Sequence, residues 1–212
     1  MAARRRLIET IRSRGLDDLS ILRLFEEVPR HHFLPPGVQS RAYEDAPLPI
    51  GWGQTASQPS LQAQTLQLLD VGPEDRVLEI GTGSGFFTAL LARLADRVHS
   101  VERIRELSQR ARRALDELEI RNVALLVGDG SIGWRKYGPY DRITVAAASP
   151  DIPPALLDQL APSGRMVLPV GSRDLQELVL VEKDEEGEVV RNEAGDPCTF
   201  VPLLGRYGWP EE

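Results

Sequence analysis

Val77-Leu78-Glu79-Ile80-Gly81-Thr82-Gly83-Ser84-Gly85-Phe86-Phe87-Thr88 is the stretch that decides the fold. Its first four residues form a short apolar run broken by one acid, which predicts a buried strand. The glycines that follow predict a tight turn in which a side chain would block close approach to the backbone. Apolar residues then recur at helical spacing through residues 86–94. A strand, a glycine turn and a helix in this order predict the nucleotide-binding unit of a doubly wound α/β sheet.

The spacing of the glycines separates two classes of ligand. A dinucleotide site has the pattern Gly-x-Gly-x-x-Gly, and the position of its third glycine is Phe86 here. The pattern is instead Glu-x-Gly-x-Gly-x-Gly, which resembles the first motif of S-adenosylmethionine-dependent methyltransferases. That resemblance implies that the amino-acid end of the ligand lies over the turn, with Glu79 facing its ammonium group. A turn that needs glycine only for its backbone conformation is the alternative.

The composition limits the classes of partner and compartment. The chain has 212 residues, of which 42% are hydrophobic and 27% charged, as is typical of a globular domain. A formal net charge of −7 disfavours general affinity for nucleic acid, and no apolar run reaches membrane-spanning length. Cys198 is the only cysteine, so we expect no internal disulfide and a cytoplasmic protein. The three histidines form no cluster that predicts a metal site.

Periodicity and turn residues outline one domain over residues 1–212. Residues 1–70 are expected to supply N-terminal helices and a substrate loop, and residues 71–212 the nucleotide-binding α/β core. In the first part, helices are predicted over 4–14, 18–28 and 60–69, the last capped by Ser57 or Ser60. In the core, the predicted elements are strands at 98–102, 123–127, 142–148, 165–170 and 200–203, helices at 105–118 and 154–160, and a hairpin of 175–182 with 188–191.

Two acids stand at strand ends, where ligands bind in open α/β sheets. Glu102 lies about twenty residues beyond the glycine turn, a position where a carboxylate commonly binds ribose hydroxyls. Asp129 follows the next strand between Gly128 and Gly130, and from there it can reach the same crevice. The resemblance to S-adenosylmethionine-dependent methyltransferases implies that it lies beside the adenine. The alternatives are a surface acid for Glu102 and an Asx turn for Asp129.

A second informative stretch covers residues 43–59. It contains three prolines, two glycines and a cluster of small polar side chains, which make it too irregular to predict a strand. Ordered loops of this kind usually carry function. A packing loop that covers the edge of the sheet is the alternative.

The loop Pro47–Pro59 and the glycine turn together resemble the protein-L-isoaspartate (D-aspartate) O-methyltransferase family. The most specific part is Gln54-Thr55-Ala56-Ser57-Gln58-Pro59, although Ala56 stands where the family usually has isoleucine. Shorter matches run along almost the whole chain, from Val28-Pro29-Arg30 to Phe200-Val201-Pro202-Leu203.

The resemblance implies a Rossmann-like S-adenosylmethionine-dependent methyltransferase sheet of about seven strands with an unusual order near its C-terminal end. It implies methyl transfer from S-adenosylmethionine to the α-carboxylate of L-isoaspartyl residues in damaged proteins and peptides, without a metal. Ser57 would orient that carboxylate as the catalytic residue, with Gln54 and Thr55 beside it in substrate binding. The implied cofactor-binding residues are Glu79, Gly81, Gly83, Gly85, Glu102, Asp129 and Gly130. We expect a monomer with no nucleic-acid or membrane partner.

A methyltransferase that acts on RNA or a small metabolite is the competing hypothesis, since it would use the same glycine turn and Glu102. The acidic composition and the 54–59 segment count against it. The strand at 142–148 also ends in Ser149-Pro150, without the Asn- or Asp-Pro-Pro-aromatic motif of amino-group methyltransferases. A non-catalytic module is disfavoured because the acids of the site are all present. Gln62, where some relatives have histidine, leaves the substrate-side contacts open.

Overall fold

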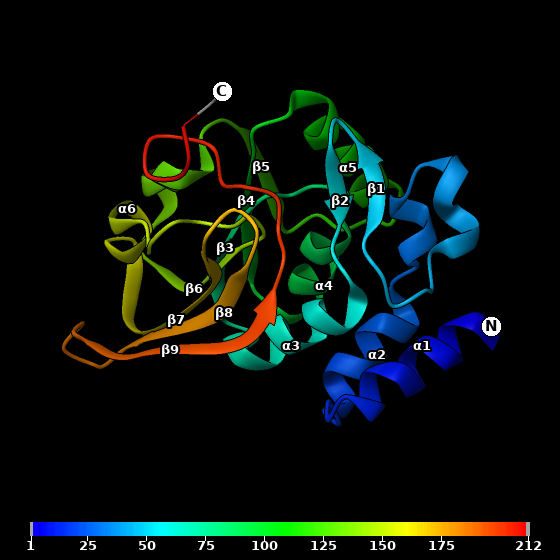
Figure 1. Ribbon diagram of the computed structural model, residues 1–212, viewed down its shortest axis with the longest axis horizontal. Coiled ribbons are helices and arrows are strands. Elements are labelled where there is room, and N and C mark those ends of the chain that lie inside the picture. The colour runs from blue at the N-terminus through cyan, green and yellow to red at the C-terminus, as the bar shows by residue number, and fades with distance from the viewer. Residues whose placement is uncertain (1, 211–212) are drawn as a thin grey trace.

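The centre of the molecule is one mixed sheet of seven strands in the order β5-β4-β3-β6-β7-β8-β9 (Figure 1). The computed structural model describes residues 2–210, except for the side chains of residues 191–194 and 196. The last two strands run antiparallel to their neighbours, and the other five are parallel. The strands are β3 (Arg76–Ile80), β4 (Arg97–Glu102), β5 (Val123–Val127), β6 (Tyr140–Val145), β7 (Leu160–Gly171), β8 (Gln176–Lys183) and β9 (Val189–Cys198).

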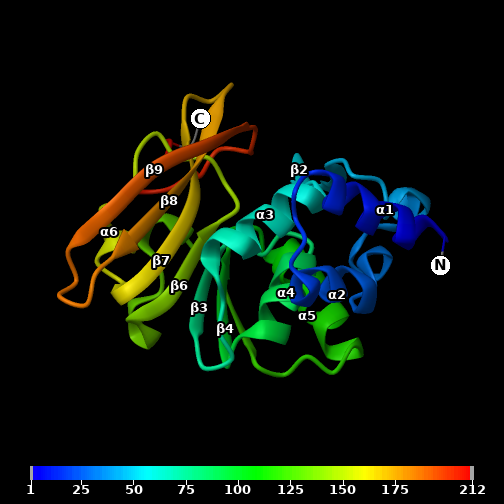
Figure 2. The ribbon, with the colours of Figure 1, turned by 90° about the horizontal axis from the view of Figure 1, so that it is seen from below.

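Helices cover both faces of this sheet (Figure 2). One face carries the longer helices, and the N-terminal pair packs outside them; the short α6 lies against the other face. The predicted doubly wound α/β fold with N-terminal helices is therefore confirmed. The helices are α1 (Ala2–Ser13), α2 (Leu19–Glu27), α3 (Pro59–Leu69), α4 (Phe86–Leu94), α5 (Arg105–Glu117) and α6 (Pro154–Leu157). Among the described residues, no helix is both long and apolar enough to span a membrane.

Neighbouring side chains of β3 enter different cores, because successive side chains of a strand point to opposite faces. Val77 joins the apolar cluster beneath α3 and α4, and Leu78 and Ile80 join the cluster on the other face. Leu7 of α1 and Phe25 of α2 belong to the same cluster as Val77. The N-terminal helices thus extend the core of the sheet.

The segment 43–59 differs from the prediction, because it contains a two-stranded hairpin of β1 (Leu48–Gly51) and β2 (Gln54–Ala56). Trp52 and Gly53 connect the strands with φ of 53° and 70°. Positive φ at both central residues gives a turn whose twist matches antiparallel strands. Burial alternates along β1, so one face of the hairpin packs on the protein.

The start of α3 also differs from the prediction that Ser57 or Ser60 caps it. Gln58 occupies the cap position and makes no side-chain cap bond. The main-chain N–H of Ser60 instead donates to Asp45 Oδ1 at 2.8 Å. The cap therefore comes from a residue that is distant in sequence, and local helix-start patterns do not show it.

The predicted last strand at 200–203 is wrong, because this segment makes only an isolated bridge between Ala148 and Pro202. Ala148 N–H donates to Val201 C=O and Leu203 N–H donates to Ala148 C=O, both at 2.7 Å. Pro202 has no N–H with which to continue a ladder. Residues 200–204 instead cross the carboxyl ends of the strands as an extended segment, called the strap below (Figure 1).

His99 of β4 is buried in an aromatic cluster. Its ring stacks on Tyr137 with centroids 4.5 Å apart and meets Trp134 and Tyr140 edge-on at 5.5 and 5.6 Å. Burial lowers the pKa of His99 to about 4, and the charges of Arg97 and Arg76 act in the same direction. The imidazole is therefore neutral in the folded protein at neutral pH.

We predict that this histidine makes the fold sensitive to acid. Its folded pKa of about 4 lies below the ordinary value of 6.5, so between these values the unfolded chain binds a proton that the folded chain does not. The free energy of unfolding should fall as the pH drops through this window. In urea titrations at several pH values, His99→Phe should show a shallower fall than the wild type. Equal slopes for both proteins would contradict the assignment.

Candidate active site

The glycine turn links β3 to α4 through backbone conformations that L side chains rarely adopt. Gly81, Gly83 and Gly85 have φ of 94°, 54° and 87°. A Cβ at Gly85 would lie 2.9 Å from the Cβ of Ala111 of α5, so glycine there permits close helix packing. A Cβ at Gly83 would meet nothing closer than Ile50 at 3.5 Å. Gly83 therefore presents open backbone to the space beneath the hairpin.

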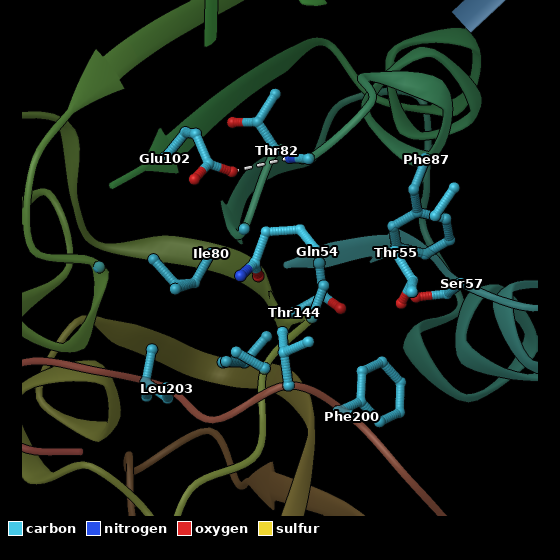
Figure 3. A pocket seen from close by; sticks show the side chains of 18 of the residues that line it. Gln54, Thr55, Ser57, Ile80, Thr82, Phe87, Glu102, Thr144, Phe200 and Leu203 are labelled. Atoms are coloured by element: carbon cyan, nitrogen blue, oxygen red, sulfur yellow. Dashed lines mark hydrogen bonds between the residues drawn. The ribbon is translucent and has the colours of Figure 1, made fainter. Parts of the chain in front are cut away.

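That space is a pocket at the carboxyl ends of β3, β4 and β6, where the strand order reverses (Figure 3). Ligands bind at this place in open α/β sheets. The β1–β2 hairpin and the strap at 200–204 form its other walls. It contains about 1000 Å³ of empty space, with open solvent at its mouth included.

Glu102 lines the pocket and joins the ends of two neighbouring strands. Its Oε2 accepts the Gly83 N–H at 2.8 Å, and its Oε1 accepts the Ile104 N–H at 2.9 Å. The side chain is buried, and Figure 3 shows its bond to the turn. Each carboxylate oxygen has a second lone pair, so Glu102 can still accept hydrogen bonds from a ligand's hydroxyl groups.

Glu79 is not among the residues that line the pocket. It is fully buried beneath the turn, and its Oε2 accepts hydrogen bonds from Thr88 Oγ1 at 2.5 Å and Ser100 Oγ at 2.6 Å. Ser100 Oγ also lies 2.5 Å from Thr82 Oγ1 in the turn. Burial raises the pKa of Glu79 to about 8, against the lowering effect of the Ser100 and Thr88 hydroxyls. The residue thus supports the turn through a hydrogen-bond network.

Asp129 forms the Asx turn that was the alternative to an adenine contact. Its Oδ1 accepts the N–H and hydroxyl of Ser131 at 2.8 and 2.7 Å, and its Oδ2 accepts the Arg206 N–H at 2.9 Å. The carboxylate therefore fastens the segment after the strap to the end of β5. Of Asp129 and Gly130, only Gly130 lines the pocket described above.

The hairpin and the residue after it supply the polar groups on the other side of the pocket. In Figure 3, Gln54 projects into the middle, between Ile80 and Thr144. Thr55 and Ser57 lie together at the far end from Glu102 (Figure 3). The structure thus brings the predicted substrate residues and the predicted ribose carboxylate to one pocket, at opposite ends.

Apolar side chains complete the walls and were not predicted as site residues. Phe87 lies near Ser57, and Phe200 and Leu203 of the strap close the opposite wall (Figure 3). Gln62 lines the pocket as well, and its Oε1 is buried with no hydrogen-bond partner among the described residues. That oxygen is an acceptor for a ligand's N–H. Within residues 2–210, no group of His, Cys, Asp and Glu side chains is arranged to hold a metal ion.

Arg30 is the other residue near the site that was given no role from the sequence. It lies in a short 3₁₀ helix, Arg30–Phe33, and is only 1% exposed. Its guanidinium donates to the Ser57 carbonyl at 2.9 Å. The one signal in the sequence is Val28-Pro29-Arg30, which belongs to the family resemblance without indicating this contact.

Comparison with known proteins gives one consistent result. The family model for protein-L-isoaspartate(D-aspartate) O-methyltransferase matches residues 2–208. The protein-L-isoaspartate O-methyltransferase of Geobacter metallireducens is 48% identical over 211 residues, which cover 99% of this chain and 97% of the relative. The enzyme of the same name from Aeropyrum pernix is 47% identical over 215 residues, covering 99% and 82%.

Solved structures agree with the sequence relatives. One protein-L-isoaspartate O-methyltransferase superimposes with a TM-score of 0.85 at 32% identity, covering 97% of this chain and 67% of the other. A Plasmodium falciparum protein solved in complex with S-adenosyl-L-homocysteine shares the fold, with a TM-score of 0.79 at 24% identity, covering 93% of this chain and 96% of the other. The chain therefore belongs to the protein-L-isoaspartate(D-aspartate) O-methyltransferase family (EC 2.1.1.77), the S-adenosylmethionine-dependent methyltransferases of protein repair.

Proposed function

We propose that the pocket binds S-adenosylmethionine at its Glu102 end and an isoaspartyl side branch at its Ser57 end. The observation that carries this proposal is the placement of both residues on one pocket at the switch point of the sheet. The residues fit the cofactor, since Glu102 offers unused lone pairs to ribose hydroxyls and Gly83 leaves the backbone open to close approach. Gly81, Gly85 and Gly130 would shape the same cradle.

The fit of the two remaining predicted cofactor residues is indirect. Glu79 would act by holding Thr82 in place through Ser100, because its carboxyl is buried beneath the turn. Asp129 would act by fixing the segment that follows the pocket-lining strap. Both residues would then shape the cofactor end of the pocket through the residues that they hold.

When bound, S-adenosylmethionine supplies a methyl group on a positively charged sulfur. The acceptor is the α-carboxylate of an isoaspartyl residue, which is ionised at neutral pH because its ordinary pKa is about 3.5. The chain therefore needs no general base. What its residues must do is align the carboxylate and exclude water from the two opposite charges. Ser57 donates the orienting hydrogen bond, with Gln54 and Thr55 beside it.

The apolar walls fit this task. Ile80, Phe200 and Leu203 surround the middle of the pocket, where the reacting groups would meet (Figure 3). Removing water there strengthens the electrostatic interactions of the site. The buried acceptor of Gln62 is available to a main-chain N–H of the substrate.

We further propose that the chain works in the cytoplasm as a single-domain monomer on isoaspartyl proteins and peptides. The free cysteine, Cys198, is buried, and burial raises its pKa to about 11. A neutral buried thiol of this kind is suited to a reducing compartment. The acidic composition gives no support for a nucleic-acid partner.

Selectivity for the isoaspartyl form tests the function directly. A site built around the α-carboxylate branch leaves polar groups unpaired when it receives a normal aspartyl peptide, so we expect transfer only to the isoaspartyl peptide. The measurement is transfer of a labelled methyl group to an isoaspartyl peptide and to its aspartyl twin of the same sequence. Equal rates on the two peptides would contradict the proposal and favour a methyltransferase of another substrate class.

Glu102→Ala tests the cofactor end. Loss of an acceptor for two ribose hydroxyls should cost roughly 1–3 kcal/mol, which weakens S-adenosylmethionine binding by about tenfold or more. Calorimetric titration with the cofactor measures this change. Glu106→Ala, an exposed acid on α5, is the control for the loss of one negative charge. Unchanged affinity in Glu102→Ala would remove Glu102 from the site.

Ser57→Ala tests the substrate end. Loss of one positioned donor should lower the rate of methyl transfer by about tenfold to a thousandfold. The melting temperature and cofactor affinity should change little, because the cap of α3 comes from Asp45 and not from Ser57. Ser60→Ala is the comparator, since Ser60 lies in the first turn of α3 and does not line the pocket. Full activity of Ser57→Ala would exclude its catalytic role.

A further inference from the structure

Arg30 holds the two segments that flank the hairpin. Nη1 donates to the carbonyls of Ala42 at 2.8 Å and Glu44 at 3.4 Å. Nη2 donates to the carbonyls of Ala46 at 3.5 Å and Ser57 at 2.9 Å. Three of these carbonyls precede the hairpin and the fourth follows it. One planar group thus fixes both ends of the hairpin at once.

The same guanidinium contacts the residue that follows the glycine turn. Its central carbon lies 5.8 Å from the ring centroid of Phe86, within the range of a cation–π contact. Phe86 is the first residue of α4 and directly follows Gly85 of the glycine turn. Arg30 therefore contacts the segments that flank the hairpin through its N–H groups, and the first residue of α4 through the face of its guanidinium.

A second group fixes Ser57 from the other side. Asp45 accepts the Ser60 N–H at 2.8 Å and the Gln58 side-chain amide at 2.9 Å, so it holds the start of α3 immediately after Ser57. Asp45 is also the charge that most favours the ionised form of Arg30. Burial lowers the pKa of Arg30 to about 10, so the guanidinium stays charged at neutral pH.

We propose that Arg30 is a positioning residue for methyl transfer: it sets the place of Ser57 relative to the glycine turn. This inference rests on the proposed role of Ser57. In-line displacement depends on the separation and alignment of the two reactants, and a misplacement of about 1 Å can cost a hundredfold in rate. A fork of several fixed donors is needed to hold four carbonyls, and the single ammonium of lysine cannot reproduce that geometry.

Arg30→Lys is the main test, because it keeps the positive charge and most of the aliphatic stem. We expect kcat on an isoaspartyl peptide to fall by about ten- to a hundredfold. Affinity for S-adenosylmethionine in calorimetry should stay within about twofold of the wild type, because Arg30 does not line the pocket. Rates are divided by the fraction of protein that binds the cofactor, so partial unfolding does not count as loss of turnover.

Arg112→Lys is the matched control. Arg112 is half-buried and, like Arg30, donates to main-chain carbonyls, here those of Val123 and Ile120, both at 3.0 Å. It does not line the pocket. We expect it to lower the melting temperature without changing kcat. An equal loss of kcat in both variants would mean that Arg30 only stabilises the fold, and would overturn the inference.

The double variant Arg30→Lys/Ser57→Ala separates this inference from the proposed function. If Arg30 acts through Ser57, the double variant should lose little more kcat than Ser57→Ala alone. Multiplicative losses would overturn the positioning role and leave the catalytic role of Ser57 intact. Full activity of Ser57→Ala alone would overturn both.

A second variant covers the case in which Arg30→Lys does not fold. Phe86→Leu removes the ring beneath the guanidinium and keeps every donor of Arg30. Loss of this contact should lower kcat by at least about threefold, with cofactor affinity within about twofold of the wild type. If Arg30→Lys does not fold, unchanged kcat in Phe86→Leu would overturn the inference; if it folds, unchanged kcat in Arg30→Lys would overturn it.

Discussion

The hydrogen bond from the Gly83 main chain to the Glu102 carboxylate is the contact on which the site depends. It ties the turn after β3 to the last residue of β4, the neighbouring parallel strand. A turn of residues with positive φ has many accessible conformations in an unfolded chain, because glycine is permissive. One buried carboxylate with a second bond to Ile104 selects among them. The position of the Glu102 end of the pocket therefore follows from the register of two strands.

Two buried polar groups then fix the parts of the site that this bond does not reach. Glu79 holds Thr82 through Ser100 from beneath the turn, and Arg30 holds the hairpin through main-chain carbonyls. Each is costly to bury unless its hydrogen bonds are made. Each retains one atom without a partner in the described structure, Oε1 of Glu79 and Nε of Arg30. These two residues therefore hold the glycine turn and the hairpin at fixed positions relative to the sheet.

The parts of the fold that follow from local pattern were predictable. The Glu79–Gly85 turn and the acid at the end of β4 depend on neighbouring residues, and the structure has them where the pattern indicates. The β1–β2 hairpin was missed, because Trp52 is an unusual residue for a turn with positive φ. The capping of α3 by Asp45 and the wall at 200–204 were missed for a different reason. Both depend on contacts between segments that are distant in sequence, and the pattern of apolar residues along the chain does not indicate such contacts.

Asp129-Gly130 has a chemical consequence for the lifetime of the molecule. Isoaspartate forms when the main-chain nitrogen of the following residue attacks the aspartyl side chain, and a following glycine offers no steric hindrance to that attack. Here the carboxylate of Asp129 accepts three hydrogen bonds, two from Ser131 and one from Arg206, and Gly130 begins a short helical turn. Ring closure would have to break these bonds and twist that turn. A member of a family that repairs isoaspartate thus carries a damage-prone Asp-Gly sequence beside its own site. The hydrogen bonds of the folded state oppose the formation of isoaspartate there.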